Sequence, residues 1–386
     1  MICSMNLKLK KLVTYLFILV AGISNSFAQG DLKLSFRNSV VYAGIEVGSK
    51  GVKLSVIEVN KANKKGQVYQ IIKDTSVNSD FISFSAPTFN STVSAMETLF
   101  NKAEKQYDIS SDRIFTAISS GVKGQADKEN KGTWIKNLSD SFKTRIAEPS
   151  RNVAIIEIAE EARLSHLGIV PNDRRYSTFL IDIGSGNTKG GYFPFGNTNE
   201  FKLFQLNWGT KSTSNAVDKR TEDDITISNY QKQLARVLSG AVDKDVTYAV
   251  NESGAYNMSD YVAISGGIAW SAATLLYPEL LDNAVVPVSY EEIEKLGENL
   301  YSKYNTLSAD FLVKKLDEKK YDKAKIAKEI KSVHQVFDQK SLMAGVGLLL
   351  KIMRQFKGIY EGKEFYLVKN GQVGWISAYV NQQTEK

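Results

Sequence analysis

The sequence contains one short pattern twice, and this repeat constrains the fold more than any other feature. Residues 45–53 read IEVGSKGVK and residues 181–189 read IDIGSGNTK. Aligned without gaps, both have isoleucine, an acid, a branched apolar residue, glycine and serine, and both have lysine seven positions after the acid. Apolar residues before each turn predict a buried strand that ends at a glycine turn and returns as a hairpin. The repeat therefore predicts two similar units, each opened by such a hairpin.

The length of 386 residues agrees with two domains, because a chain of this size exceeds one ordinary hydrophobic core. Strand patterns and amphipathic helix patterns alternate along both halves, as in the helical spacing of residues 92–107 and the apolar run at 153–158. We expect an α/β fold with mixed sheets, because the hairpins add antiparallel pairs. The expected domains are residues 29–170 and 171–386, and Asn370-Gly371 predicts a last hairpin.

The first residues form a separate segment. Lysines at positions 8, 10 and 11 precede an apolar run at 12–23, and the small residues at 26 and 28 match a signal-peptidase site. This pattern predicts a secretory signal peptide at residues 1–28, with cleavage after Ala28 and export to the periplasm. The alternative is a retained membrane anchor, which the shortness of the apolar run disfavours. Contact with a membrane is expected only through this segment.

Composition excludes several kinds of site. Removing residues 1–28 takes away three of the 49 basic residues, so 46 remain against 42 acidic residues, a net charge of +4. That charge is too small to indicate a nucleic-acid partner. The single cysteine, Cys3, lies in the signal segment, which excludes disulfides, zinc–thiolate sites and a cysteine nucleophile from the mature chain. The sequence has only two histidines, which disfavours a histidine-based triad. Phosphate chemistry with carboxylates and Mg²⁺ needs neither histidine nor cysteine.

Seven short motifs occur in order along the chain. They are IEVGSKGVKL at the first turn, SSGVK at 119–123, EEARLSHLGI at 160–169, IDIGSGNTK at the second turn, NWG at 207–209, SGGIA at 265–269 and FYLVKNGQVGWI at 365–376. In this order they resemble the motifs of the exopolyphosphatase and guanosine-pentaphosphatase (Ppx/GppA) family. EEARL followed closely by DIGxG is the specific part. The resemblance implies two ribonuclease-H-like domains of the actin-like ATPase fold, with mixed sheets and an interdomain cleft.

A carboxylate at the end of a buried strand, followed by a glycine turn with exposed N–H groups, suits a phosphate and its metal. The resemblance implies roles for single residues. Glu161, the second glutamate of EEARL, would be the catalytic base that activates water, and Asp182 and Glu46 would hold Mg²⁺. The phosphate-binding candidates are Gly48, Ser49, Lys50, Gly51, Lys123, Gly184, Ser185, Gly186, Asn187, Thr188, Lys189, Gly266 and Gly267.

Plainer explanations stay open for these residues. The two turns could be ordinary hairpins that use glycine for its backbone freedom, and Gly266-Gly267 could be a simple strand-to-helix turn. Acids at the start of a helix, such as Glu161, also suit the helix dipole without a catalytic role. Arg163 is expected to pair with a nearby acid, and His166 is expected to be a packed core histidine.

The chain departs from the family at positions close to the expected chemistry. Lys189 stands where the family has a carboxylate, Lys123 where it has an arginine, and Glu46 where it has an aspartate. The serine–glycine pair that precedes EEARL in the family is replaced by Glu157-Ile158. An ammonium in place of a carboxylate changes the local charge by two units, which alters the metal affinity of the site.

Three functions follow from these observations. The first is an exported, Mg²⁺-dependent phosphohydrolase that releases terminal phosphate from polyphosphate or a related phosphoanhydride, since several lysines near the turns suit a polyanion. The second is a polyphosphate-binding protein of the same fold that has lost hydrolysis. The third is an actin-like or kinase-like nucleotide-binding protein, which the scarcity of ATP outside the cytoplasm disfavours. Homodimer formation is left open.

Overall fold

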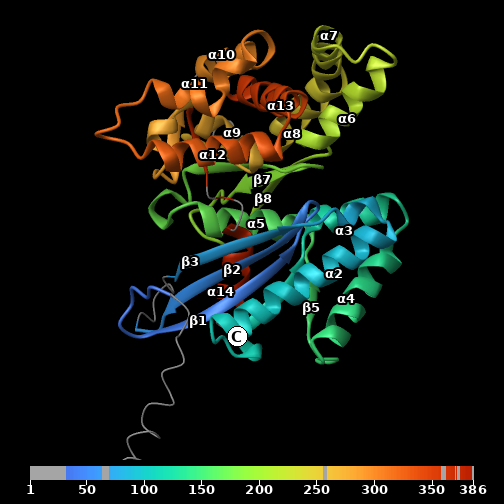
Figure 1. The fold of residues 1–386 in the computed structure, drawn as a ribbon, viewed down its shortest axis with the longest axis vertical. Coiled ribbons are helices and arrows are strands. Elements are labelled where there is room, and N and C mark those ends of the chain that lie inside the picture. Colours follow the sequence, from blue (N-terminus) through green and yellow to red (C-terminus); the bar gives the residue numbers. More distant parts are fainter. Residues whose placement is uncertain are drawn as a thin grey trace, which may run out of the picture.

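The protein, studied as a computed structural model, is described over residues 32–62, 69–254, 259–357, 362–369, 371 and 374–384. The predicted signal peptide at residues 1–28 lies outside these ranges. Figure 1 shows two parts, one above the other: a lower part in blue and cyan built on the first sheet, and an upper part in green, yellow and orange built on the second. Within the described residues, no helix combines the length and apolar character needed to cross a membrane.

The first sheet has the strand order β3-β2-β1-β4-β5. Its strands are β1 (Ser39–Val47), β2 (Gly51–Asn60), β3 (Tyr69–Asn78), β4 (Ile114–Ile118) and β5 (Val153–Ile155). β1, β2 and β3 are antiparallel neighbours, whereas β4 runs parallel to β1 and β5 runs parallel to β4. The sheet is therefore mixed, as predicted.

Three helices, α2 (Ala86–Asn101), α3 (Ser120–Lys128) and α4 (Gly132–Arg145), belong to the first sheet's layer. Helix α2 starts at Ser85, whose hydroxyl and backbone exchange hydrogen bonds with Thr88 as a capping box. Apolar residues of α2 at helical spacing then face the sheet, and Val93, Met96, Leu99 and Phe100 are buried there as the sequence pattern predicted.

The second sheet has the strand order β10-β11-β9-β6-β7-β8. Its strands are β6 (Thr178–Ile183), β7 (Thr188–Tyr192), β8 (Lys202–Leu206), β9 (Tyr261–Ser265), β10 (Val285–Val288) and β11 (Glu364–Val368). β6, β7 and β8 are antiparallel neighbours, and β9 lies parallel to both β6 and β11. This sheet is also mixed, which confirms the expected fold class.

Both hairpins of the sequence repeat have the same register. Glu46 of β1 faces Lys53 of β2, and Asp182 of β6 faces Lys189 of β7. Each acid is therefore a direct cross-strand neighbour of the lysine that follows it seven positions later. In such a pair the side chains project on the same side of the sheet, which brings opposite charges together.

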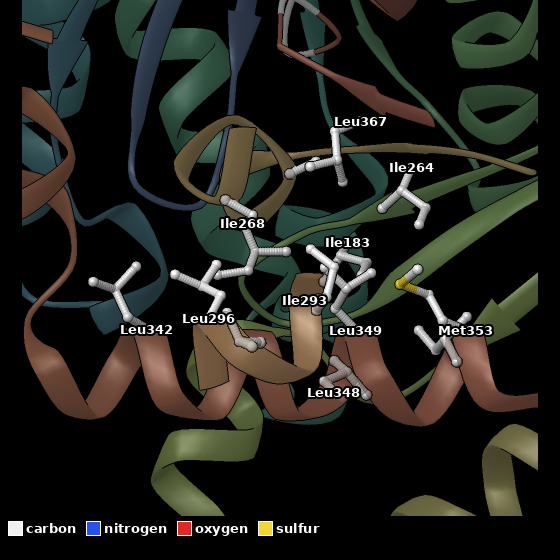
Figure 2. Close-up of a cluster of buried hydrophobic side chains, with 14 of the residues drawn as sticks. Ile183, Ile264, Ile268, Ile293, Leu296, Leu342, Leu348, Leu349, Met353 and Leu367 are labelled. Carbon is white, nitrogen blue, oxygen red and sulfur yellow. The ribbon is translucent and has the colours of Figure 1, made fainter. Parts of the chain in front are cut away.

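Helices of the upper part cover one face of the second sheet (Figure 1). They are α6 (Thr210–Thr221), α7 (Ile227–Val237), α8 (Asp243–Ser253), α9 (Gly267–Leu276), α10 (Tyr290–Ser302), α11 (Ala309–Lys314), α12 (Lys323–Val336) and α13 (Gln339–Lys357). Figure 2 shows the centre of this core, where Leu349 and Met353 of α13 lie close to Ile183 at the end of β6. Helix α12 is rich in lysine, and its buried face consists of Ile326, Ile330 and Val333.

The last described helix lies on the first sheet. Helix α14 (Gly374–Gln383) follows β11 but lies beside β1 and β2, as the dark red helix in the lower part of Figure 1 shows. It packs against α5 (Ile158–Ile169) and buries Trp375 and Ile376 in a cluster with Leu164. The hairpin predicted from Asn370-Gly371 is wrong, because a helix and not a strand follows β11; Asn370 itself lies outside the described residues. The domain bounds stay a prediction.

Replacing Gly168 with alanine is expected to lower the free energy of unfolding by about 1–3 kcal/mol. A Cβ atom at this position of α5 would lie 2.0 Å from the carbonyl oxygen of Gly374, so the two helices would have to separate. Gly124→Ala in α3 is the matched control, since nothing lies within 4 Å of its added Cβ. The control is expected to be neutral or to stabilise by up to about 1 kcal/mol. Equal urea midpoints for the two variants would contradict close packing of α5 on α14.

Candidate active site

The two glycine turns are closed in the same way. Gly48 N donates a hydrogen bond to Gly51 O at 2.9 Å, and Gly184 N donates to Asn187 O at 3.0 Å. Residues 49–50 and 185–186 therefore form the exposed tips of two equivalent loops, one at the end of each sheet. The shared geometry confirms that the sequence repeat is a structural repeat.

The start of α3 brings the two turns together. A Cβ atom added to Gly121, in the first helical turn, would lie 3.4 Å from Ser49 Oγ and 4.0 Å from Asn187 Oδ1. These two side-chain oxygens are therefore at most about 7.4 Å apart, the sum of those distances. One phosphate group can bridge such a spacing with a hydrogen bond on either side. In this turn Ser120 N donates to Glu161 Oε2 and Val122 N donates to Ser119 O, which leaves Gly121 N as the N–H group best suited to an anion.

The residues after β8 hold the second turn. Thr210 N donates to Gly184 O at 2.9 Å and Lys211 N donates to Ser185 O at 2.8 Å. Thr188 Oγ1 donates to Trp208 O at 2.7 Å from the other side of the turn. A Cβ on Gly209 would lie 2.7 Å from Asn187 N, so only glycine allows this approach. Thr188 thus positions the turn, and its hydroxyl proton is directed at Trp208.

The Gly266-Gly267 pair connects β9 to α9. Gly266 has φ = +98°, and a Cβ there would lie 2.2 Å from Ile183 O and 3.1 Å from Asp182 Oδ1. Ser265, just before the pair, donates from Oγ to Asp182 Oδ1 at 2.9 Å. Both the positive φ and the lack of space require glycine at 266. The pair lies at the carboxylate of Asp182, so it belongs to the same cluster as the second turn.

Glu161 lies in the first turns of α5 and is only 3% exposed. Its Oε2 accepts a hydrogen bond from Ser120 N, at the start of α3, at 2.5 Å. Its Oε1 lies 3.0 Å from Lys189 Nζ. Both carboxylate oxygens therefore have a cationic or N–H partner, and almost no surface of Glu161 reaches water.

Lys189 links two carboxylates from different elements. Its Nζ lies 3.0 Å from Glu161 Oε1 on α5 and 3.1 Å from Asp182 Oδ2 on β6. The lysine is 5% exposed. Burial alone would lower the pKa of the Lys189 ammonium, but the charges of Glu161 and Asp182 outweigh burial and raise that pKa above its usual range. Lys189 is therefore expected to carry its positive charge at neutral pH.

Glu46, the acid of the first hairpin, is 5% exposed, and its Oε2 lies 3.8 Å from Lys53 Nζ. Burial raises the pKa of the Glu46 carboxyl, the attraction of Lys53 opposes that shift, and the negative charge of Glu161 adds to it. Glu161 and Lys189 both act on Glu46, so Glu46 shares the electrostatic environment of the cluster around Lys189.

Two predicted lysines lie away from this buried cluster. Lys50 Nζ, at the tip of the first turn, lies 5.5 Å from the centre of the Phe337 ring, which follows α12. Burial, and next the positive charge of Lys211, lower the pKa of Lys50. Lys123 on α3 pairs with Asp127 at 2.7 Å and with Glu157 at 3.4 Å. Lys123 is thus engaged with surface acids, whereas Lys50 lies where the two parts of the chain meet.

The plainer expectations for two neighbouring residues are confirmed. Arg163 donates from Nε to Glu160 at 3.0 Å. His166 is fully buried, its Nε2 donates to Thr178 O at 3.0 Å, and its ring lies 5.0 Å from the ring of Phe193. Neither residue is part of the cluster around Lys189.

Sequence reasoning missed several residues that shape the site. Ser120 and Gly121 belong to the SSGVK motif, Gly209 to NWG and Ser265 to SGGIA, so each lay within a recognised motif but had no role assigned. A role for Ser120 could not be found from sequence, because its backbone N–H and not its side chain contacts Glu161.

No family model and no curated protein matches this sequence. Solved structures match over most of the chain. The Aquifex aeolicus member of the Ppx/GppA protein family aligns with a TM-score of 0.59 at 13% identity, covering 90% of this chain and 98% of that one. An exopolyphosphatase from Cytophaga hutchinsonii aligns with a TM-score of 0.53 at 13% identity, covering 89% and 98%. The chain has the Ppx/GppA fold.

A second Aquifex aeolicus structure, the type II variant of the Ppx/GppA phosphatase, has a TM-score of 0.55 at 14% identity and covers 89% of this chain and 99% of that one. The Ppx/GppA fold is an actin-like ATPase fold with two domains, so the fold implied by the sequence motifs is confirmed. At this identity the likeness concerns the fold, and the chemistry has to be argued from the residues of this chain.

Proposed function

We propose that this chain is a phosphohydrolase of the Ppx/GppA type that binds polyphosphate, or a related phosphoanhydride, between its two glycine turns and releases the terminal phosphate. The observation that supports this most is the convergence of both turns and the start of α3 on Gly121, next to Glu161. Backbone N–H groups and hydroxyls at such loops suit phosphate oxygens. Lys50 and Lys211, one from each part of the chain, add positive charge nearby.

In this proposal Glu161 is the general base that orients the attacking water. A base must lie within hydrogen-bond reach of the proton that it takes. Because both oxygens of Glu161 are engaged and the residue is 3% exposed, a water can reach it only after the two turns move apart or Lys189 shifts. Hydrolysis is therefore expected to require opening of the site when substrate binds.

A second function, polyphosphate binding without hydrolysis, is favoured by one observation. Lys189 places an ammonium 3.0 Å from Oε1 of the proposed base, and Ser120 N donates to its Oε2, so both oxygens of Glu161 already have a donor. A carboxylate whose two oxygens are both engaged by protein donors is poorly placed to accept a hydrogen bond from water. The phosphate-binding loops do not depend on that pair, so binding would survive where hydrolysis is lost.

We further propose that the protein acts outside the cytoplasm, most simply in the periplasm. This proposal rests on the lysines, apolar run and cleavage-type site of residues 1–28. Fusion of these residues to a reporter enzyme that folds only outside the cytoplasm is the direct measurement.

The test of the hydrolase proposal is orthophosphate release from long-chain polyphosphate by the purified protein, with and without Mg²⁺. Glu161→Gln is expected to lower the rate at least about a hundredfold, because general-base catalysis contributes that much or more. Glu160→Gln is the matched control on the same helix, since Glu160 pairs with Arg163 and not with the turns. It is expected to keep nearly the full rate.

Three other outcomes would change the assignment. If the wild-type protein releases no phosphate but polyphosphate raises its melting temperature, the binding function replaces the hydrolase. If ATP raises the melting temperature and polyphosphate does not, the protein binds nucleotides. If Glu161→Gln and Glu160→Gln are equally active, Glu161 is not the base.

A further inference from the structure

The fold family implies a divalent metal at the carboxylates of this site, so the residues can be tested for their fit to one. Each oxygen of Asp182 and Glu161 has a protein partner. Asp182 Oδ1 accepts from Ser265 Oγ and Oδ2 faces Lys189, while Glu161 Oε1 faces Lys189 and Oε2 accepts from Ser120 N. Over the described part of the chain, no group of three or more histidine, cysteine, aspartate or glutamate side chains is arranged to hold a metal ion.

The ammonium group of Lys189 occupies the space between the carboxylates of Asp182 and Glu161. Lys189 Nζ lies 3.1 Å from Asp182 and 3.0 Å from Glu161, so a metal bound by both would have to occupy the same position. Mg²⁺ needs near-octahedral oxygen ligands at about 2.0–2.1 Å, which a neighbouring cation at this distance opposes. The residues of this chain therefore do not fit a metal shared by Asp182 and Glu161.

The ammonium reduces the negative charge of the carboxylates, as a bound metal ion would. Three carboxylates, Glu46, Glu161 and Asp182, contribute negative charge beside the proposed phosphate-binding loops. Lys53 and Lys189 reduce the formal charge of this group from −3 to −1. Without these two lysines, an incoming phosphate would meet the carboxylates of the buried Glu46 and Glu161 and of the partly buried Asp182, and its binding would be opposed.

The cation is supplied by the hairpin itself. Lys189 is the direct cross-strand neighbour of Asp182, and Lys53 is the direct neighbour of Glu46 in the first hairpin. Lys189 is part of the polypeptide, is 5% exposed and pairs with two carboxylates. Unlike a bound metal ion, it cannot be removed by dilution or by a chelator.

We propose that Lys189 is a built-in cation that takes the place of a divalent metal at Asp182 and Glu161, so that this chain binds its anionic ligand without a metal. The statement about the ligand rests on the proposed function, whereas the statement about the metal does not. It concerns only whether the two carboxylates are available to a divalent ion.

The test is a titration of the purified protein with Mn²⁺, in which electron paramagnetic resonance reports the unbound ion. The wild-type protein is expected to show no saturable binding. Lys189→Glu is expected to bind a single Mn²⁺ at least about tenfold more tightly than the wild type, because it frees both carboxylates and adds a third. Lys328→Glu makes the same change of charge at an exposed position of α12, where the residues three and four positions away, Ala324, Lys325, Lys331 and Ser332, are not acidic, and is expected to behave as the wild type.

Saturable Mn²⁺ binding by the wild-type protein, or equal binding by the two variants, would overturn the proposal. The wild-type titration decides the question even if Lys189→Glu does not fold. A second measurement uses the wild-type protein with polyphosphate in EDTA, where the rise in melting temperature is expected to persist. If polyphosphate stabilises the protein only when Mg²⁺ is added, Lys189 does not replace the metal. If it never stabilises the protein, the proposed function fails, and the Mn²⁺ titration still decides the role of Lys189.

Discussion

Replacing Lys189 with methionine is expected to lower the free energy of unfolding by about 3–5 kcal/mol. Methionine keeps most of the length of the side chain but removes its charge. Glu161 and Asp182 would then stay in the interior with only Ser120 N and Ser265 Oγ as described partners. Removing one partner of a buried ion pair is costly because the other charge remains without compensation. Urea unfolding followed by tryptophan fluorescence measures the change, since Trp375 is buried near Glu46.

Lys123→Met is the matched control for this experiment. Lys123 also pairs with two acids, Asp127 and Glu157, but at the surface, so its loss is expected to cost less than about 1 kcal/mol. Adding Asp182→Asn to Lys189→Met is expected to recover part of the stability, because it removes one of the two uncompensated charges. A cost for Lys189→Met no larger than for Lys123→Met would show that the buried pairs do not hold in solution.

Acidification from about pH 6.5 to pH 4 is expected to remove about 3 kcal/mol of stability through His166 alone. Burial lowers the pKa of His166 to about 4, whereas the unfolded chain keeps the usual value near 6.5. Between about pH 4 and pH 6.5, His166 is mostly protonated in the unfolded chain and mostly neutral in the folded protein. The stability is therefore fully present above about pH 6.5 and is lost as the pH falls through this window.

The measurement is the free energy of unfolding against pH for the wild-type protein and for His166→Gln. The variant is expected to be less stable at pH 7, because the ring packs against Phe193 and Phe201. Its stability is also expected to fall less steeply between pH 6.5 and pH 4, since the titrating group is gone. Identical slopes for the two proteins would mean that His166 is not buried in its neutral form.

Much of the fold could be predicted from local patterns. The hairpins at residues 45–53 and 181–189, the buried face of α2 and the packed state of His166 all follow from residues close together in the chain. The repeat even predicted that each acid has an equivalent lysine, because both copies keep the same spacing across a turn of the same length. The length of the turn sets the register of the hairpin, so the cross-strand pairing of Asp182 with Lys189 could be predicted from the sequence.

The C-terminal segment shows where local patterns fail. Asn370-Gly371 is a strong hairpin pattern, yet β11 is followed by α14, which packs on β1 and α5 far from β11 in the chain. The helix is stabilised by burial of residues such as Ile376 against the first sheet, at Gly44 of β1. Tertiary burial of this kind outweighs a local turn preference. The local sequence of residues 365–376 does not indicate that such packing occurs.

By itself, the sequence determined that the chain has two glycine hairpins with matched acids and lysines, and that it resembles a phosphohydrolase family in the order of its motifs. Only the tertiary structure decided that Lys189, which replaces a family carboxylate, lies between Asp182 and Glu161. Asp182 is its neighbour across a hairpin, but Glu161 comes from α5 and reaches the lysine only when that helix packs beside β7. The energy between charges depends on their separation in space and on burial, and neither can be read from positions along the chain.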